Sequence, residues 1–246
     1  MTADTAQRAS SFGSVAEAYD RYRPGPPRAA LEWILRSPVG TAADLGAGTG
    51  ALTRELAARA ARVIALEPDP RMLAVLKRRS PRVAAARCRG EDLPLGPGTL
   101  DAVTVSSAWH WMDPDRTVAE LGRVLRPGGV LGVIWNGADR SVGWVTELLG
   151  TRDPSPGDRN RWSRHRFELP SGAPFDHPDS DVIRWALSMT REELVGLAGT
   201  YSSMITMPPD RRERETARVR AAVGAVMTGD RIEVPMSCRC WRAVRR

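Results

Sequence analysis

Apolar residues recur along the chain with two spacings, one typical of buried strands and the other of amphipathic helices. Compact apolar segments predict strands, at 41–43, 62–67, 83–87, 100–106, 130–135, 182–187 and 232–244. Helical spacing predicts helices, at 12–22, 28–35, 51–57, 71–79, 114–125, 142–149, 191–199 and 210–227. Strands that alternate with helices in this way predict a doubly wound α/β fold.

The last strand and the long segment before it depart from a simple alternation. We expect a mostly parallel seven-stranded sheet whose last strand, 232–244, is antiparallel and lies at the sheet edge. Residues 151–181 are rich in proline, glycine, aspartate and arginine, and a loop of that length inside a domain is typical of a lid. A cap of helix and loop over 137–181 is therefore expected after the fifth strand.

Composition and charge narrow the class of protein. The 246 residues suffice for one α/β domain with an elaboration. The formal net charge is +7, but nearly all basic residues are arginines, and Lys77 is the only lysine. Because the arginines are scattered and no basic stripe is interleaved with aromatic residues, we expect no nucleic-acid partner.

Compartment and metal content follow from what the sequence lacks. No apolar segment is long enough to cross a bilayer and no amino-terminal run resembles a signal peptide, so we expect a cytoplasmic protein without a membrane partner. The three cysteines, Cys88, Cys238 and Cys240, are too few and unsuitably spaced for a zinc site. We expect free thiols, no bound metal, and a monomer or homodimer.

A glycine-rich turn at 42–50, Ala-Ala-Asp-Leu-Gly-Ala-Gly-Thr-Gly, separates the first strand from a helix. Strand, glycine turn and helix together place a ligand at the carboxyl end of the strand. No lysine follows, which excludes a P-loop, whereas Gly46, Gly48 and Ala51 formally satisfy a dinucleotide motif. Asp44 favours a cofactor with an ammonium group, S-adenosylmethionine, although the glycines alone leave NAD open.

Further features follow in chain order at the ends of the predicted strands. Glu67 ends the second strand, Glu91-Asp92 follows the third, Trp109-His110-Trp111 follows the fourth, and Arg126-Pro127-Gly128-Gly129 precedes the fifth. With the glycine turn they resemble class I S-adenosylmethionine-dependent methyltransferases, which have a Rossmann-like fold. The nearest resemblance is to type 11 small-molecule methyltransferases, including trans-aconitate methyltransferase-like proteins and actinobacterial natural-product methyltransferases.

This resemblance divides the chain into parts with separate tasks. It implies that residues 1–27 form a helical segment that closes over the cofactor and that 28–136 form the S-adenosylmethionine-binding core. The cap at 137–181 would select the substrate, and 182–246 would return to the core and complete the cap. The likeness weakens over about 151–181.

The predicted cofactor site combines direct chemistry with the family resemblance. Glu67 can accept hydrogen bonds from both ribose hydroxyls, as an acid does in dinucleotide folds. The resemblance implies that Asp92 binds the adenine amine and that Tyr19 or Arg23, in a Tyr-Asp-x-x-Arg-Pro motif, touches the methionine carboxylate. The predicted cofactor-binding residues are Tyr19, Arg23, Asp44, Gly46, Ala47, Gly48, Gly50, Glu67, Pro68, Met72, Glu91, Asp92, Leu93, Ser107 and Trp109.

Methyl transfer is a displacement at an activated carbon, so positioning supplies most of the catalysis and no metal is required. His110 is the predicted general base, with His165 and His177 as rivals, and a role in shaping the pocket wall is equally open for His110. The predicted substrate-binding residues are Tyr22, Trp109, His110, Trp111, Trp135 and Trp144.

The expected reaction is methylation of a small-molecule acceptor, a secondary metabolite such as an indole or other heteroaromatic compound. An RNA methyltransferase is a competing hypothesis, but the chain has Ser106–His110 where base-methylating enzymes need an Asn/Asp-Pro-Pro-aromatic loop. The sequence also leaves open a non-catalytic cofactor-binding protein and an NAD-binding enzyme.

Overall fold

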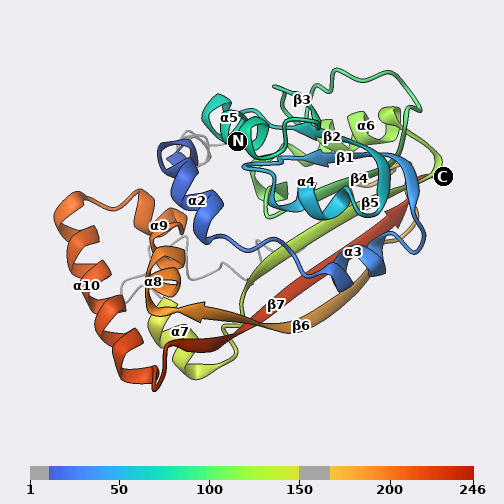
Figure 1. Ribbon diagram of the computed structural model, residues 1–246. Coiled ribbons are helices and arrows are strands. Elements are labelled where there is room, and N and C mark those ends of the chain that lie inside the picture. Colours follow the sequence, from blue (N-terminus) through green and yellow to red (C-terminus); the bar gives the residue numbers. More distant parts are fainter. Residues whose placement is uncertain (1–10, 150–166) are drawn as a thin grey trace.

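A computed structural model describes residues 11–149 and 167–246. One seven-stranded sheet runs through the molecule in the order β3-β2-β1-β4-β5-β7-β6 (Figure 1). The strands are β1 (Val39–Leu45), β2 (Ala60–Leu66), β3 (Ala84–Ala86), β4 (Leu100–Ser106), β5 (Leu125–Ala138), β6 (Asp179–Thr190) and β7 (Arg231–Val244). The first five are parallel, and β7 is antiparallel to both β5 and β6. This confirms the predicted seven-stranded α/β sheet.

The prediction that the last strand lies at the edge was wrong. β7 lies between β5 and β6, and β6 is the edge strand. The two strands differ in burial, which gives the physical reason. One face of β7 carries the buried residues Val234, Met236, Cys238 and Cys240, whereas β6 begins with four exposed residues. A charged, exposed start is typical of an edge strand, which must resist pairing with other chains.

Helices cover both faces of the sheet, as in a doubly wound fold. They are η1 (Phe12–Val15), α2 (Ala16–Tyr22), α3 (Arg28–Ile34), α4 (Ala51–Leu56), α5 (Pro70–Arg79), η2 (Trp109–Trp111), α6 (Pro114–Val124), α7 (Gly143–Leu149), α8 (Arg191–Gly199), α9 (Ser202–Ile205) and α10 (Pro209–Val226). α3 and α4 pack on Ala102 of β4, whereas α6 packs on Val103, the next residue along that strand, which faces the other way.

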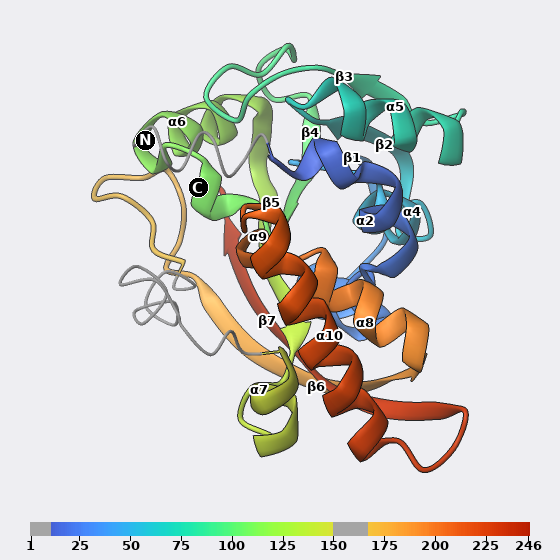
Figure 2. The ribbon, with the colours of Figure 1, turned by 90° about the vertical axis from the view of Figure 1, so that its left-hand side faces the viewer.

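A third cluster of apolar residues holds the cap together. α7, α8 and α10 pack against the ends of β6 and β7 through Val145, Leu197, Val223, Val234 and Met236. α8 and α10 lie side by side, and α7 lies at the lower end of the long strands (Figure 2). The cap therefore combines one helix that follows β5 with helices that come from the last third of the chain.

The segment 126–129, predicted as a turn before the fifth strand, is an irregularity within β5. Leu125 pairs with Leu100 but Val130 pairs with Ala102, so residues of β5 loop out between the two pairs. Gly128 has a φ of 78°, a conformation that glycine adopts without strain. Within 11–149 and 167–246, no helix is long and apolar enough to cross a membrane.

Candidate active site

The glycine turn joins β1 to α4, and its glycines serve different purposes. Gly46, Gly48 and Gly50 all have positive φ, of 70°, 57° and 90°. A Cβ on Gly46 would lie 2.5 Å from Cβ of Ala108, so that position is filled by the loop after β4. A Cβ on Gly48 would meet nothing within 4 Å. The turn is thus closed on one side by protein and bare on the other, where a ligand can approach the backbone.

Asp44 lies at the end of β1 and is only 1% exposed. Its Oδ2 accepts a hydrogen bond of 2.6 Å from Thr53 Oγ1, while its buried Oδ1 has no hydrogen-bond partner among the described residues. Burial raises the pKa of Asp44 to about 7, the Thr53 hydrogen bond opposes this, and the nearby charge of Glu67 adds to it. An orphaned buried carboxylate oxygen beside an open glycine turn suits the ammonium group of S-adenosylmethionine.

Glu67 follows β2 and turns toward the glycine turn. Its Oε2 accepts a 2.8 Å hydrogen bond from the Gly48 amide and its Oε1 a 2.9 Å bond from the Asp69 amide. Burial raises the pKa of Glu67, and these two backbone bonds oppose the rise. Because each carboxylate oxygen can accept more than one hydrogen bond, the fixed carboxylate can still receive a pair of ribose hydroxyls.

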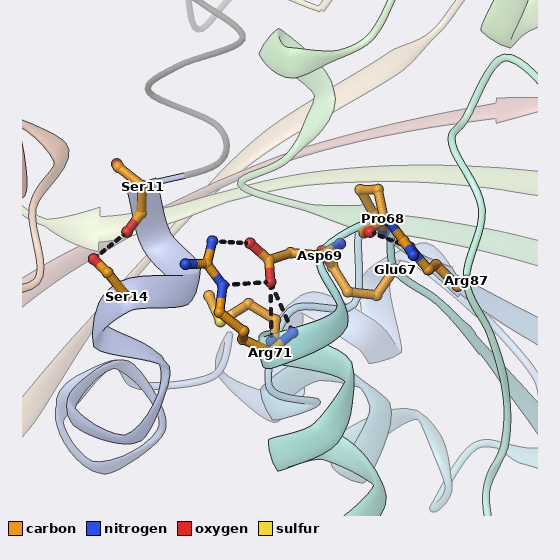
Figure 3. A network of polar contacts seen from close by, with 8 residues as sticks. Ser11, Ser14, Glu67, Pro68, Asp69, Arg71 and Arg87 are labelled. Atoms are coloured by element: carbon orange, nitrogen blue, oxygen red, sulfur yellow. Dashed lines mark hydrogen bonds and ion pairs between the residues drawn. The ribbon is translucent and has the colours of Figure 1, made fainter.

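A polar network next to Glu67 holds the amino-terminal segment (Figure 3). Asp69 caps α5 by accepting a 2.8 Å bond from the Arg71 amide, and it pairs with the Arg71 guanidinium at 2.8 Å. A Cβ on Gly13 would lie 2.3 Å from both of these side chains, so η1 rests directly on the pair. The Pro68 carbonyl accepts a bond from Arg87 at 3.1 Å.

The residues predicted to hold the adenine occupy different environments. Asp92 is exposed, and its charge and that of Glu67 help to raise the pKa of half-buried Cys88 to about 11, after burial as the largest cause. These two carboxylates therefore converge near one thiol, at the side of the site where ribose and adenine are expected. Glu91 instead accepts a 2.8 Å bond from the Asp113 amide at the start of α6, so its role toward the cofactor stays a prediction.

Two apolar residues of the predicted cofactor site, Met72 and Leu93, lie in hydrophobic clusters. Met72 is buried with Ala16 and Val75, and Phe12 and Tyr19 pack against this cluster. Leu93 is buried under α6, where its amide donates to Glu120. Both side chains pack against other apolar residues, and their contacts with the cofactor stay predictions.

A cavity of about 590 Å³, here called the acceptor cavity, opens beside the glycine turn. His110, Trp111 and Trp135 line it, as predicted for the substrate site. The His110 ring lies 4.0 Å from the Trp111 ring and 4.8 Å from the Trp135 ring, measured between centroids. A narrower cavity at the glycine turn shares several walls with it: Tyr19, Arg23, Ser107, Asn136, Gly137 and Tyr201.

Ser107 lies where these two cavities meet. Its φ is 53°, and among the described residues it alone has a positive φ without being glycine. Its amide donates to the Ile134 carbonyl at 2.8 Å, which fixes the bend where the chain leaves β4. Such a bend costs free energy and is found mainly where function requires it.

Three residues predicted to bind substrate do not line the acceptor cavity. Trp109 packs into the core against Phe167, because η2 is a 3₁₀ turn that points Trp109 and Trp111 in different directions. Trp144 packs in the cap cluster, and Tyr22 lies on Gly196 of α8. Trp109 is also a predicted cofactor contact, and it does not line the cavity at the glycine turn either.

His177, one of the two rival histidines, does not line the acceptor cavity. His177 lines a separate cavity with Phe167 and Trp241. His165 lies outside the described residues. Among the histidines that the structure describes, His110 is therefore the one beside the predicted path of methyl transfer.

Arg23 is held at the mouth of the site by the cap. Its Nε donates to Thr200 Oγ1 at 2.9 Å and its Nη2 to the Thr200 carbonyl at 3.1 Å. The guanidinium lies 4.2 Å from the centre of the Tyr201 ring and 5.4 Å from that of Tyr19. Since arginine has five N–H donors, others can still reach a carboxylate.

Sequence reasoning missed Asn136 and Tyr201. Asn136 Nδ2 donates to the Gly25 carbonyl at 2.9 Å and its Oδ1 accepts from Trp185 Nε1 at 3.2 Å. It therefore ties the amino-terminal segment to the sheet beneath both cavities. The only signal was its place directly after Trp135, at the end of a predicted strand.

Comparison with known proteins agrees with this geometry. Residues 43–133 match the family described as a methyltransferase domain. Proteins of Mycobacterium bovis and Mycobacterium tuberculosis named uncharacterized methyltransferases are 38% identical over 248 residues, covering 99% of this chain and 99% of theirs. The chain belongs to the class I S-adenosylmethionine-dependent methyltransferases.

Solved structures show the same fold. A candidate type II methyltransferase from Anaeromyxobacter dehalogenans has a TM-score of 0.65 and 28% identity, covering 91% of this chain and 98% of that one. Phosphoethanolamine N-methyltransferase 2 of Haemonchus contortus, in complex with phosphomonomethylethanolamine and S-adenosylhomocysteine, has a TM-score of 0.55 and 16% identity, covering 95% of this chain and 57% of that one. At that identity the likeness concerns the fold.

Proposed function

We propose that the protein transfers the methyl group of S-adenosylmethionine to a small organic molecule, in the manner of enzymes of secondary metabolism. The observation that carries this proposal is the acceptor cavity of about 590 Å³ that shares walls with the narrower cavity at the glycine turn. That volume is within the range of about 300–1,000 Å³ typical of small-molecule sites. The shared walls allow donor and acceptor to meet.

The chain's residues divide the reaction between them. When bound, the cofactor supplies a methyl group already activated by a sulfonium. Asp44 would hold its ammonium group and Glu67 its ribose, and Ser107 shapes the passage between the cavities. His110 would accept a proton if the nucleophilic atom carries one, because an imidazole titrates near neutral pH. Trp111 and Trp135 support a planar acceptor, which can stack on their faces.

Binding and turnover test this function together. Calorimetry should show that S-adenosylmethionine binds and that NAD does not. Incubation with small-molecule pools, followed by mass spectrometry, should reveal one or more compounds that gain a methyl group. Binding of NAD in place of S-adenosylmethionine would refute the proposal, and cofactor binding without product in any pool would favour a non-catalytic role. Methylated RNA as the product would instead support a nucleic-acid methyltransferase.

A further inference from the structure

The floor of the acceptor cavity is one face of the sheet where β5, β7 and β6 lie side by side. Cross-strand pairing places Trp135 beside Arg239 and Arg239 beside Val182 in one row. The next row on the same face contains Gly137, Ser237 and Arg184. Side chains two residues apart on a strand point to the same side, so these two rows face the cavity together.

The charges around this floor are mostly of one sign. The described lining residues of the cavity include four arginines and one aspartate: Arg23, Arg140, Arg184, Arg239 and Asp139. Asp139 is held ionised, since hydrogen bonds from Ser141 and the charges of Arg184 and Arg239 keep its pKa below the ordinary value. One carboxylate faces several guanidinium groups, which leaves the described wall of the cavity positive.

Arg184 is held less firmly than Arg23 and Arg140. Arg23 is fixed by Thr200 near the glycine turn, and Arg140 Nη2 donates to the Leu149 carbonyl at 3.3 Å. Arg184 Nε lies 3.8 Å from Asp139 Oδ2, and the Arg184 side chain is 74% exposed. Such a long and exposed contact is weak, so Arg184 can turn toward a ligand at little cost.

Small residues leave room between the floor arginines. Gly137 presents no side chain, and a Cβ there would meet nothing within 4 Å. Ser237, its partner across the strands, is also small. A flat anionic group resting on this pair would have Arg184 in the same row and Arg239 in the next.

We propose that the acceptor is an organic anion whose carboxylate or phosphate group rests on Gly137 and Ser237 and is recognised by Arg184 and Arg239. This rests on the proposed function and specifies its substrate class. The methyl group goes to another atom of the acceptor, at the end that lies toward His110 and Trp135. A cationic donor beside a positive wall also makes an anionic acceptor electrostatically favourable.

Matched pairs of probes test this inference on the full chain. Calorimetry would compare 4-hydroxybenzoate with 4-hydroxybenzamide, and phenyl phosphate with phenol, in the presence and absence of S-adenosylhomocysteine. We expect the anionic member of at least one pair to bind about tenfold more tightly. Equal affinities in both pairs, or no binding by any probe, would overturn the inference. The benzoate and phosphate arms distinguish which anion the site prefers.

Single substitutions test whether the preference for anions arises from Arg184 and Arg239. Arg184→Gln and Arg239→Gln should each lower the affinity for the preferred anion by about tenfold and leave the neutral probe unchanged. Asp139→Asn should raise the anion affinity, because it removes the opposing charge. Arg212→Gln, an exposed arginine of α10 outside the cavity, is the matched control and should change nothing. Equal effects of the control and the floor variants would contradict the proposal.

Binding of S-adenosylhomocysteine separates this inference from the proposed function. Each variant should bind S-adenosylhomocysteine with unchanged affinity, which also shows that the variant is folded. If Arg239→Gln does not fold, Arg239→Lys replaces it. If the wild-type protein does not bind S-adenosylhomocysteine, the proposed function is wrong, and the probe comparison without it still decides whether the cavity prefers an anionic ligand. If it binds but the probes are not distinguished, only the inference about the anion fails.

Discussion

Replacing Asp44 by asparagine should stabilise the free protein at alkaline pH and weaken the binding of the cofactor. Burial raises the pKa of Asp44 from 3.8 to about 7 in the folded protein. Between these values the folded protein holds a proton that the unfolded chain has lost. The free energy of unfolding therefore falls as pH rises toward 7, and ionising the buried group costs about 4 kcal/mol in full, at about 1.4 kcal/mol per pH unit.

The variant does not carry this cost. About two of the roughly three pH units lie between pH 5 and pH 7, so the free energy of unfolding of Asp44→Asn, relative to wild type, should rise by about 3 kcal/mol from pH 5 to pH 8. The asparagine amide itself adds a constant cost of about 1–2 kcal/mol if its donor lacks a partner, which leaves the pH difference unchanged. Urea unfolding followed by circular dichroism, without ligand, measures the free energy of unfolding of the wild type and of Asp44→Asn at each pH.

The affinity for the cofactor should depend on pH in the opposite direction to the stability of the wild-type protein. An ammonium group binds the ionised carboxylate, so the affinity of the wild type for S-adenosylmethionine should increase as pH rises through about 7. Asp44→Asn should bind more weakly by about 1–3 kcal/mol at pH 8, with little pH dependence from this site. Asp230→Asn, in the exposed turn before β7, is the control. The reasoning fails if Asp44→Asn follows the wild-type pH dependence in both measurements.

Other substitutions test separate parts of the site. His110→Phe should lower kcat about a hundredfold without changing the Kd of S-adenosylmethionine, and unchanged turnover would leave His110 as a wall residue. Glu67→Gln should weaken cofactor binding by about 1–3 kcal/mol in calorimetry, and unchanged affinity would contradict the ribose assignment. Gly46→Ala should destabilise the protein by about 2–5 kcal/mol, because its positive φ costs about 1–2 kcal/mol and the contact of the methyl group with Ala108 at 2.5 Å adds about 1–3 kcal/mol. Gly48→Ala should cost only about 1–2 kcal/mol of stability yet block the cofactor, and equal unfolding curves for the two glycine variants would refute this distinction.

The cofactor half of the site was predictable because its information is local. Strand, turn and helix from 39 to 56 are contiguous, and the open side of Gly48 follows from that one supersecondary unit. Glu67 needed a single further step, since β1 and β2 are neighbouring parallel strands and their carboxyl ends meet at one edge of the sheet. Placing these residues required the order of two strands and no knowledge of the cap.

The acceptor half could not be predicted in the same way. Arg184 and Arg239 reach one floor through the antiparallel register of β6 on β7, and a shift of one residue in that register would place the two side chains on opposite faces of the sheet. For a related reason, the sequence could not show which of the tryptophans line the acceptor cavity. Trp109 and Trp111 are two residues apart, and a strand would have aligned them, but the 3₁₀ turn separates them.

The amino-terminal helix α2 connects these two halves physically. Asp20 pairs with Arg79 of α5 at 2.8 Å on the core side, while Arg21 pairs with Glu192 of α8 at 3.0 Å on the cap side. Arg23 continues the connection through Thr200 and lines both cavities. Because exposed ion pairs contribute little individually, the Arg21 contact can break at small cost, whereas Asp20 is nearly buried. The segment is therefore joined to the core by a nearly buried carboxylate and to the cap mainly by the hydrogen bonds from Arg23 to buried Thr200, so Arg23 is the principal polar link between the cofactor half and the cap.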